Sequence, residues 1–333
     1  MSNQITTSMV KQYGSNVYHL VQQKGSRLLN LVDVETQQGE EQFFEQIGAV
    51  DARERVGRHS KVIYSDTPHA RRKVMFRDFY YADMCDKEDK LRTIIDPTNQ
   101  YAVAARMALA RKIDDEIIAA ILGTAYTGKD GSTPVELDIV NKWAATEEGS
   151  SVNTNLTVHA LRKAKKYFWD SEAVGFQGDG LYEDELVCIV DPSQLEYMLS
   201  IEQVTSSDYN TVKALAQGDV NSFMGFKFIR TKRLPVTDAA AYTIADGSVA
   251  GQTAGQITST AAGGAGVQVE ANARRIIFFQ RFGMKAVMPR SIFTRITPEM
   301  AEYHYNTQIY AAMSFGATRM EEERVLEMFC KED

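Results

Sequence analysis

The chain has 333 residues, a formal net charge of -7 at pH 7 and three cysteines. An acidic chain with charges of both signs along its length is not typical of a protein that wraps nucleic acid with a basic face. The odd number of widely spaced cysteines, Cys85, Cys188 and Cys330, indicates free thiols in a reducing compartment and no disulfide framework. The first residues lack the pattern of a signal peptide, and no apolar window is long enough to cross a bilayer. We therefore expect a cytosol-like location and no membrane partner.

Residues 1–50 are rich in Gln, Ser, Thr and Asn and carry only scattered apolar side chains. So few apolar residues cannot offset the conformational entropy lost in ordering a separate core. The segment is therefore predicted to be an N-terminal arm. Its apolar residues are expected to be buried on other parts of the chain or on neighbouring subunits.

The segment from Arg53 to Arg77 contains more basic than acidic residues. Short alternating pieces at 61–64 and 73–76 flank a turn at 66–69, which predicts a β-hairpin. An isolated hairpin is at best marginally stable, so this one needs a partner surface. We favour docking on acidic surfaces of identical subunits, and the alternatives are a solvated strand face and nucleic-acid binding. The candidate contact residues are Arg53, Arg55, Arg58, Lys61, Arg71, Arg72, Lys73 and Arg77.

One long helix is predicted from Asp96 to Gly123. Asp96 can cap the first turn, Pro97 suits the first helical position, and Gly123 suits the C-terminal stop. At about 1.5 Å per residue this helix spans roughly 40 Å, so we expect something flat to pack across it. Apolar residues recur along it at spacings of three and four, namely Val103, Met107, Ala110, Ile113, Ile117 and Ile121.

Charged residues cluster in the middle of this helix. Asp114, Asp115 and Glu116 are consecutive, so their carboxylates point in different directions and cannot share a proton or a metal ion. Arg111 with Asp115, and Lys112 with Glu116, have the spacing of i,i+4 ion pairs. The pattern predicts ion pairs on the helix surface or contacts with neighbouring subunits. Arg111 and Asp115 are the candidate contact residues of this helix.

The second half of the chain alternates helices and strands. An amphipathic helix is predicted at 155–173, and a buried strand at 185–190 leads into a helix at 192–200. A single strand is predicted at 222–235. The remaining predictions are a surface loop at 236–267, two strands around Gly283, and one long half-buried strand over 290–317 as the flat partner of the long helix.

No catalytic, cofactor or metal site is predicted. Gly123 to Lys129 resembles a phosphate-binding loop, but Asp130 follows where Ser or Thr would bind magnesium, and the segment follows a helix when it should precede one. The five histidines show no ligand spacing, no serine lies in a nucleophile elbow, and no cysteine has an activating neighbourhood. We expect a protein that is not an enzyme.

Several segments follow one another in a characteristic order, namely ARKIDDEIIAAILG, LTVHALRKAKKYF, ELVCIVDPSQLEYML and YAAMSFGATRMEEERVLEM. The most specific piece is the step from Gly218 through Gly225-Phe226 to Leu234-Pro235, followed by the strand around Ile276. With these segments, the order of arm, charged hairpin and long helix resembles the major capsid protein of tailed double-stranded DNA bacteriophages, with the Hong Kong 97-type fold. The resemblance covers nearly the whole chain.

The resemblance implies an α+β fold with an N-terminal arm, an extended β-hairpin loop, a peripheral domain of a long spine helix plus long strands, and an axial domain. The implied boundaries are 1–50 for the arm, 53–80 for the extended loop, 81–134 and 286–333 for the peripheral domain with the spine helix at 97–122, and 135–285 for the axial domain with a loop or insertion at 236–267.

The same resemblance implies a function. The chain is expected to self-assemble into hexamers and pentamers of an icosahedral phage head, in the bacterial host cytoplasm, and to enclose double-stranded DNA by non-specific proximity. Separate scaffolding and portal proteins, and in some members decoration proteins, are the implied partners. No crosslinking pair is predicted. The alternatives are an encapsulin-type shell that packages a cargo enzyme, and a nucleotide- or DNA-binding protein.

Overall fold

The computed structural model describes residues 20–37, 39–55, 57–58, 61–86, 98–147, 153–173, 185–201, 222–237, 243–244, 257–259, 267–268, 273–300 and 304–332. The chain divides into two compact units. The first unit contains Met1–Ser26, Arg77–Ile113 and Met288–Phe315, and the second contains Arg27–Phe76, Asp114–Val287 and Gly316–Asp333.

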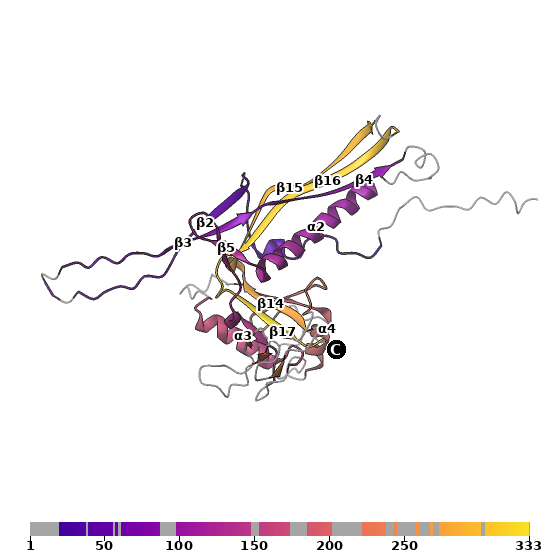
Figure 1. Ribbon diagram of the computed structural model, residues 1–333. Helices are drawn as coiled ribbons and strands as arrows, with labels where there is room; N and C mark the ends of the chain where they lie inside the picture. The colour runs from indigo at the N-terminus through magenta and orange to yellow at the C-terminus, as the bar shows by residue number, and fades with distance from the viewer. Residues whose placement is uncertain are drawn as a thin grey trace, which may run out of the picture. The chain divides into compact units, whose positions relative to one another are not determined.

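Figure 1 shows the helices and strands of the described residues. The helices are α2 (Thr98–Leu122), α3 (Val158–Asp170) and α4 (Pro192–Ser200), with short 3-10 helices η2 (Leu29–Leu31), η3 (Ile139–Asn141) and η4 (Arg281–Gly283). The strands before α3 are β1 (Asp33–Glu35), β2 (Glu41–Ile47), β3 (His69–Met75), β4 (Arg77–Cys85), β5 (Ala125–Thr127), β6 (Thr133–Val135) and β7 (Lys142–Ala144). The later strands are β8 (Leu186–Val190), β9 (Ser222–Phe223), β10 (Phe226–Arg230), β11 (Thr243–Ile244), β12 (Ile257–Ser259), β13 (Val267–Gln268), β14 (Arg274–Gln280), β15 (Met284–Met300), β16 (Asn306–Arg319) and β17 (Val325–Cys330).

The long helix predicted from the sequence is confirmed over α2. Gly123 directly follows the last residue of the helix, as expected. Its amide still bonds the carbonyl of Ala119 at 2.8 Å, and an added Cβ would lie 2.6 Å from that oxygen, so the close approach favours glycine. Ile113, Ile117 and Ile121 are buried, whereas Val103 is 40% exposed, so the apolar stripe does not include Val103. The predicted cap residues 96 and 97 lie outside the described residues.

In the first unit, β4 pairs antiparallel with β16 from Arg77 opposite Phe315 to Cys85 opposite Thr307, and β15 lies on the other side of β16. The ammonium of Lys112 in α2 lies 5.2 Å from the ring centre of Phe79 in β4, so the helix packs beside this sheet. The predicted flat partner of the long helix is therefore a sheet.

The single strand predicted over 290–317 is wrong. The chain reverses after β15, and β16 begins at Asn306, directly after His304 and Tyr305 with φ angles of 52° and 61°. Such left-handed backbone is typical of a tight reversal. Two half-buried strands in succession show the same alternation of side chains as one long strand, so the pattern alone did not reveal the reversal.

The second unit is built around a sheet in which the described residues give the strand order β7-β17-β14-β8-β10-β9. β8 is buried at every position and lies between β14, which is antiparallel to it, and β10, which is parallel. Figure 1 shows α3 and α4 beside this sheet. The ring of Phe168 in α3 lies 6.3 Å from that of Phe226, which lies 5.2 Å from that of Phe278. This aromatic chain joins helix and sheet in one core.

α4 begins at Pro192 as the sequence predicts, whereas α3 begins at Val158 and ends at Asp170, so it is shorter than the predicted helix at 155–173. The Thr157 hydroxyl accepts a hydrogen bond from the amide of Ala160 at 3.2 Å, and Asp191 accepts one from the amide of Ser193 at 3.2 Å. Each side chain satisfies an amide that the helix itself leaves unpaired. The buried strand that leads into a helix, predicted at 185–200, is confirmed by β8 and α4.

A smaller sheet in the second unit has the order β2-β3-β5-β6 among the described residues. β3 pairs antiparallel with β2 over its whole length. The hairpin predicted within 53–77 is therefore wrong: residues 61–67 form no strand, and the partner of β3 comes from 41–47, which the sequence places in the N-terminal arm. The motif 61–64 alternates for too few residues to identify a strand.

Two further sequence predictions need correction. The single strand predicted at 222–235 is a short hairpin, in which β9 and β10 are joined by Met224 and Gly225 with φ angles of 53° and 86°. The predicted loop at 236–267 contains short strands, because β11 pairs with both β12 and β13. Most of that segment lies outside the described residues.

Gly316 in β16 permits a close approach to the chain at the end of β3. A Cβ at this position would lie 2.4 Å from the carbonyl oxygen of Met75 and 3.0 Å from the side chain of Val74. Because backbone cannot yield as a flexible side chain can, Gly316→Ala is expected to lower the free energy of unfolding by about 1–3 kcal/mol. Urea denaturation followed by circular dichroism measures it.

Gly57→Ala is the matched control for this prediction. An added Cβ at Gly57 meets nothing within 4 Å, so the expected change is within about 0.5 kcal/mol. Equal free energies of unfolding for Gly316→Ala and Gly57→Ala would contradict this prediction. They would show that the chain can move apart to accommodate a Cβ at position 316 without loss of stability.

Candidate functional site

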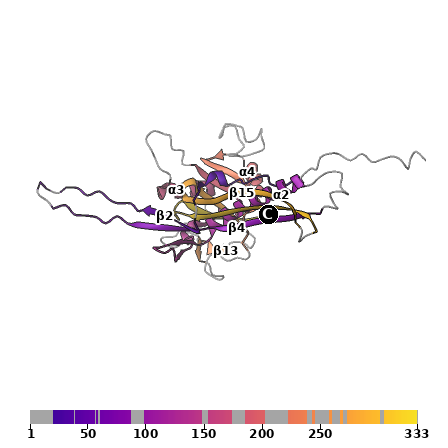
Figure 2. The ribbon, with the colours of Figure 1, turned by 90° about the horizontal axis from the view of Figure 1, so that it is seen from above.

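The segment 48–68 between β2 and β3 carries the first group of candidate residues. Its two ends are joined by a hydrogen bond of 2.9 Å from the amide of Gly48 to the carbonyl of Pro68. Figures 1 and 2 show the segment extending away from β2 and β3 in both views. We call residues 48–68 the extended segment. All its described residues from 49 to 67 are exposed, so it contributes no core to its own chain.

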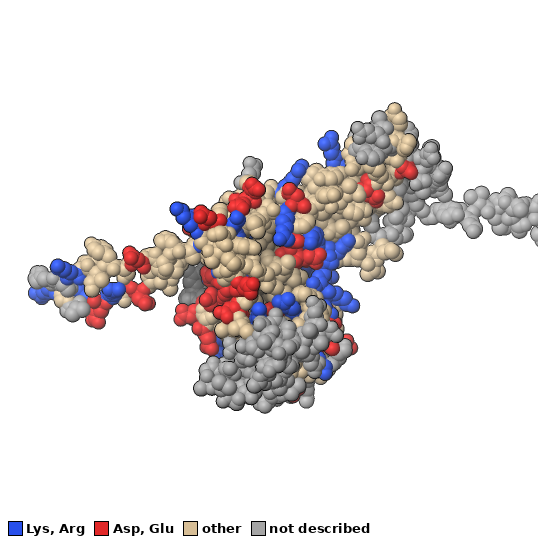
Figure 3. All heavy atoms as spheres, in the orientation of Figure 1, with Lys and Arg blue, Asp and Glu red and all other residues tan. Residues whose placement is uncertain are grey.

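Both charged and apolar side chains are exposed along the extended segment. The apolar ones are Val62, Ile63 and Tyr64, with exposures of 75%, 68% and 88%. Both basic and acidic side chains are exposed along it, as the space-filling view in Figure 3 shows. Of the candidates, Arg53, Arg55, Arg58 and Lys61 all lie here. An apolar strip bordered by charges is typical of a surface that a protein partner covers.

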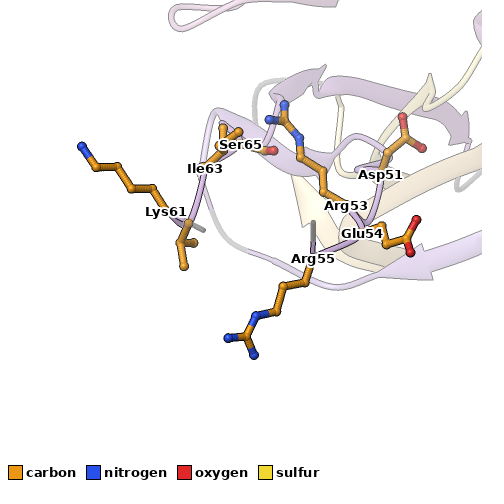
Figure 4. A pocket seen from close by; sticks show the side chains of 8 residues that line it. Asp51, Arg53, Glu54, Arg55, Lys61, Ile63 and Ser65 are labelled. Atoms are coloured by element: carbon orange, nitrogen blue, oxygen red, sulfur yellow. The ribbon is translucent and has the colours of Figure 1, made fainter. Parts of the chain in front are cut away.

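The two sides of the extended segment enclose an open hollow of about 740 Å³, lined by Asp51, Arg53, Glu54, Arg55, Lys61, Val62, Ile63 and Ser65. Figure 4 shows Arg55 and Lys61 pointing outward, away from each other. The side chain of Arg55 donates to the carbonyl of Gly57 at 3.0 Å and also to that of Arg58. These local hydrogen bonds stabilise the backbone conformation around Gly57 and Arg58. No set of side chains in this hollow converges on a point as in a small-molecule site.

The basic candidates in β3 are engaged within the chain. Arg71 forms an ion pair with Glu45, and Lys73 pairs with Glu41 at 2.5 Å across the β2–β3 ladder. Arg72 lies on the opposite face and is only 7% exposed. Arg77 is exposed at the first position of β4.

The charged middle of α2 binds distant parts of the chain. In the first unit, the Arg111 guanidinium donates to the side chain of Gln22 at 2.8 Å and to the carbonyl of Gln23 at 3.3 Å. In the second unit, Asp115 forms an ion pair of 2.8 Å with Arg233. Both candidates of this helix therefore have partners within the chain.

Asp114 was no candidate, yet it is the most buried of the three acidic residues, with 1% exposure. Its carboxylate accepts hydrogen bonds from the amide of Arg27 at 3.1 Å and from the amide of Leu28 at 3.2 Å. Charge-assisted bonds to backbone amides are strong, so Asp114 anchors the beginning of the second unit's chain to α2.

Removing the carboxylate at Asp114 should release this anchor. Asp114→Ala leaves the buried amide of Leu28 and the part-buried amide of Arg27 without this acceptor, so we expect the free energy of unfolding to fall by about 2–3 kcal/mol. We also expect faster tryptic cleavage after Arg27, measured by mass spectrometry.

The control for this prediction is Asp115→Asn. It weakens the part-exposed pair with Arg233, for which the expected loss is at most about 1 kcal/mol. Similar cleavage rates after Arg27 in the two variants would contradict the anchoring role of Asp114.

A buried ionic cluster, which we call the junction, consists of Arg72, Arg319 and Glu322. Arg319 is fully buried at the end of β16, and its guanidinium donates to the carbonyls of Ile121 at 2.7 Å, Gly123 at 2.9 Å and Val135 at 3.2 Å. Burial lowers the pKa of Arg319, and the nearby carboxylate of Glu322 opposes that shift. Arg319 thus satisfies carbonyls at the C-terminal end of α2, where cations are favoured.

Sequence reasoning missed Arg319 and Glu322. The one signal for Arg319 is a lone arginine at the end of a strand of apolar and small residues, which resembles any charged residue at a strand terminus. Glu322 lies in the acidic run 321–323, which reads as a solvated turn. Only the fold brings both residues to α2 and β3.

The described residues contain no arrangement typical of an active site. No group of three or more His, Cys, Asp or Glu among them is placed to hold a metal ion. The thiols of Cys188 and Cys330 are buried, and burial raises the pKa of each, which opposes thiolate formation. The glycine-rich segment from Gly123 to Lys129 contains β5, paired with β6, and does not precede a helix.

No helix within the described part of the chain has both the length and the apolar composition of a membrane span.

The model of a family described as phage capsid protein matches residues 5–332. No curated protein matches the chain.

Three of the solved structures that match are phage capsids. The capsid of cyanophage P-SCSP1u superposes with a TM-score of 0.69 at 17% identity, over 100% of this chain and 97% of that one. The capsid of Ralstonia phage GP4 gives a TM-score of 0.66 at 11% identity, over 98% and 96% of the two chains. The mature capsid of bacteriophage PhiM1 gives 0.63 at 12% identity, over 97% and 92%. At such identities the likeness concerns the fold.

Proposed function

The chain belongs to the phage capsid protein family, and from this premise we propose that it is the major subunit of an icosahedral head, assembled as hexamers and pentamers. It is a structural component of the phage particle and not an enzyme. The α+β fold of the Hong Kong 97 type, with its long spine helix, is confirmed by the match over the whole chain.

One observation supports the proposed contacts between neighbouring subunits of the shell. The extended segment exposes both Val62–Tyr64 and the basic side chains Arg53, Arg55, Arg58 and Lys61, with no core of its own to order it. Exposed apolar residues in a segment of this length are stabilised when a partner covers them. Identical subunits are the partners that a capsid supplies, and their net acidic charge complements the basic residues.

The remaining candidate contact residues differ in their exposure and in the partners that they have within the chain. Arg77 is exposed and stays a proposed contact. Arg71, Lys73, Arg111 and Asp115 already have partners within the chain, so a neighbouring subunit would share those partners or replace them. For Arg72, which is buried, we propose an internal role in place of subunit contact.

We further propose that the spine helix with its long strands forms the peripheral domain, that the unit around β8 and β14 forms the axial domain, and that the N-terminal arm reaches neighbouring subunits. Separate scaffolding and portal proteins are proposed as partners, with the packaged DNA held by proximity. The family match favours this function over an encapsulin that packages a cargo enzyme.

Negative-stain electron microscopy of the purified full-length chain tests the proposal. Pentamers, hexamers or closed shells are the expected particles. A chain that stays strictly monomeric and folded at high concentration would contradict self-assembly. Shells with the ultraviolet absorbance of nucleic acid would support a DNA-containing head, whereas an enzyme recovered inside them would support the encapsulin alternative.

A further inference from the structure

The turn between β16 and β17 binds both strands that carry the extended segment. The carbonyl of Met320 accepts a hydrogen bond from the side chain of Gln46 in β2 at 2.8 Å and another from Nε of Arg72 in β3 at 2.9 Å. The amide of Met320 in turn donates to the carbonyl of Gly283 at 2.9 Å. The hairpin of β2 and β3 is thus tied to the body of its unit through this turn.

Glu322 is the anion shared by the two buried arginines of the junction. Its Oε2 lies 2.6 Å from Nη2 of Arg72, and its Oε1 lies 3.3 Å from Nε of Arg319. The two guanidinium groups repel each other, since Arg72 contributes to lowering the pKa of Arg319. Without the carboxylate, two like charges would remain buried without a shared counter-charge.

Besides its ladder with β2, β3 pairs backbone to backbone with β5 over a short ladder. Arg72 pairs with Thr127, and Lys73 pairs with Tyr126. Each residue of this short ladder lies in or beside the part of β3 that the junction holds. The ladder and the junction therefore fix the hairpin at the same place. Without the junction, this part of β3 keeps the ladder to β5 and two hydrogen bonds, from the Thr127 hydroxyl to the carbonyl of Arg71 at 2.7 Å and from the Arg71 guanidinium to the carbonyl of Lys129 at 3.2 Å.

We infer that Glu322 is a positioning residue, which holds the β2–β3 hairpin through Arg72 and so sets the direction in which the extended segment leaves the fold. A small rotation of the hairpin moves the far end of this segment by a larger distance. The inference rests on the proposed function, in which the extended segment contacts neighbouring subunits. Arg319 connects the same carboxylate to the end of the spine helix, so helix and hairpin share one anchor.

Amide hydrogen exchange on the unassembled full-length chain tests this role. In Glu322→Gln we expect exchange in β2 and β3 to become roughly tenfold faster or more, with exchange in β8 and β14 unchanged. The matched control is Glu321→Gln, which makes the same chemical change one residue away. Glu321 pairs with Arg324 at the surface, so the control should leave exchange in the hairpin unchanged.

A second variant, Arg72→Lys, keeps the positive charge but cannot contact Met320 and Glu322 with one planar fork. We expect the same amides to exchange faster in it. Unchanged exchange in the hairpin of Glu322→Gln would overturn the inference, and so would an equal rise in β8, which would make Glu322 a residue of general stability.

The proposed lattice role of the extended segment is tested separately by its deletion. Failure of that test leaves the exchange result intact, so the two conclusions can fail independently.

Discussion

Replacement of residues 49–67 by Asn-Gly is expected to give a folded chain that does not close into shells. The hydrogen bond between Gly48 and Pro68 already brings the two ends together. Asn-Gly is the pair best suited to a two-residue connection between antiparallel strands. Every described residue that the deletion removes is exposed, so the midpoint of thermal unfolding should change by only a few degrees.

The effect on assembly should be large for a physical reason. If neighbouring subunits cover Val62, Ile63 and Tyr64 in the shell, the deletion removes apolar burial at every repeat of the lattice. Particle counts by electron microscopy, together with sedimentation velocity, measure this effect. Closed shells of normal size and yield from the shortened chain would contradict the proposed contact.

Two milder variants separate the charge and apolar contributions of the extended segment. Changing Arg53, Arg55, Arg58 and Lys61 to Gln should slow assembly most at low salt, because salt screens exposed charges. Changing Val62, Ile63 and Tyr64 to Ser should impair assembly at all salt concentrations, because burial of apolar area does not depend on that screening. The two sets together indicate which part of the segment supplies the contact energy.

Arg319→Ala is expected to lower the free energy of unfolding by about 3–5 kcal/mol. The substitution leaves the carbonyls of Ile121, Gly123 and Val135 without their buried donor and opens a cavity at the end of α2. Arg319→Lys should recover only part of this loss, because an ammonium on a flexible stem does not match three fixed acceptors. The midpoints of urea unfolding give the comparison.

Arg324→Ala provides the control for this prediction. Arg324 lies five residues along the chain in the same turn region, is partly exposed, pairs with Glu321 and donates to the side chain of Gln280 at 2.8 Å. Its removal should lower the free energy of unfolding by about 1–2 kcal/mol, less than the loss expected for Arg319→Ala. Equal losses for Arg319→Ala and Arg324→Ala would show that the junction does not stabilise the fold.

Sequence periodicity predicted the elements whose burial pattern is local. α2 and α3 carry apolar residues at helical spacing and β8 is a continuous apolar run, each within one segment, and Gly123 marks the end of the long helix. These elements carry the resemblance between the order of segments in this chain and that of a capsid protein. The family and the fold class could therefore be predicted before any pairing of strands was known.

The pairing of strands could not be predicted in the same way. The sequence pattern predicts a partner for β3 within its own basic segment, whereas its partner in the structure is β2, on the far side of the extended segment. Alternation reports which face of a strand is buried and says nothing about which strand lies beside it. The same ambiguity merged β15 and β16 into one strand.

The junction was missed for another physical reason. Arg72 and Arg319 are distant in sequence, and each looks like a surface residue until the fold buries it. A buried cation is acceptable only beside particular carbonyls and carboxylates, and those acceptors come from the end of α2 and from the turn after β16. Such convergence of segments has no signature in local composition.

The burial of all the native thiols makes this chain suitable for site-specific labelling. Cys85, Cys188 and Cys330 are enclosed by the fold, so maleimide reagents should leave the intact protein unmodified. Gly57, with open space around its Cα, could then receive a single reactive cysteine at the far end of the extended segment. A fluorophore or a thiol crosslinker at that position would report which surface of a neighbouring copy the segment reaches, in solution and during assembly.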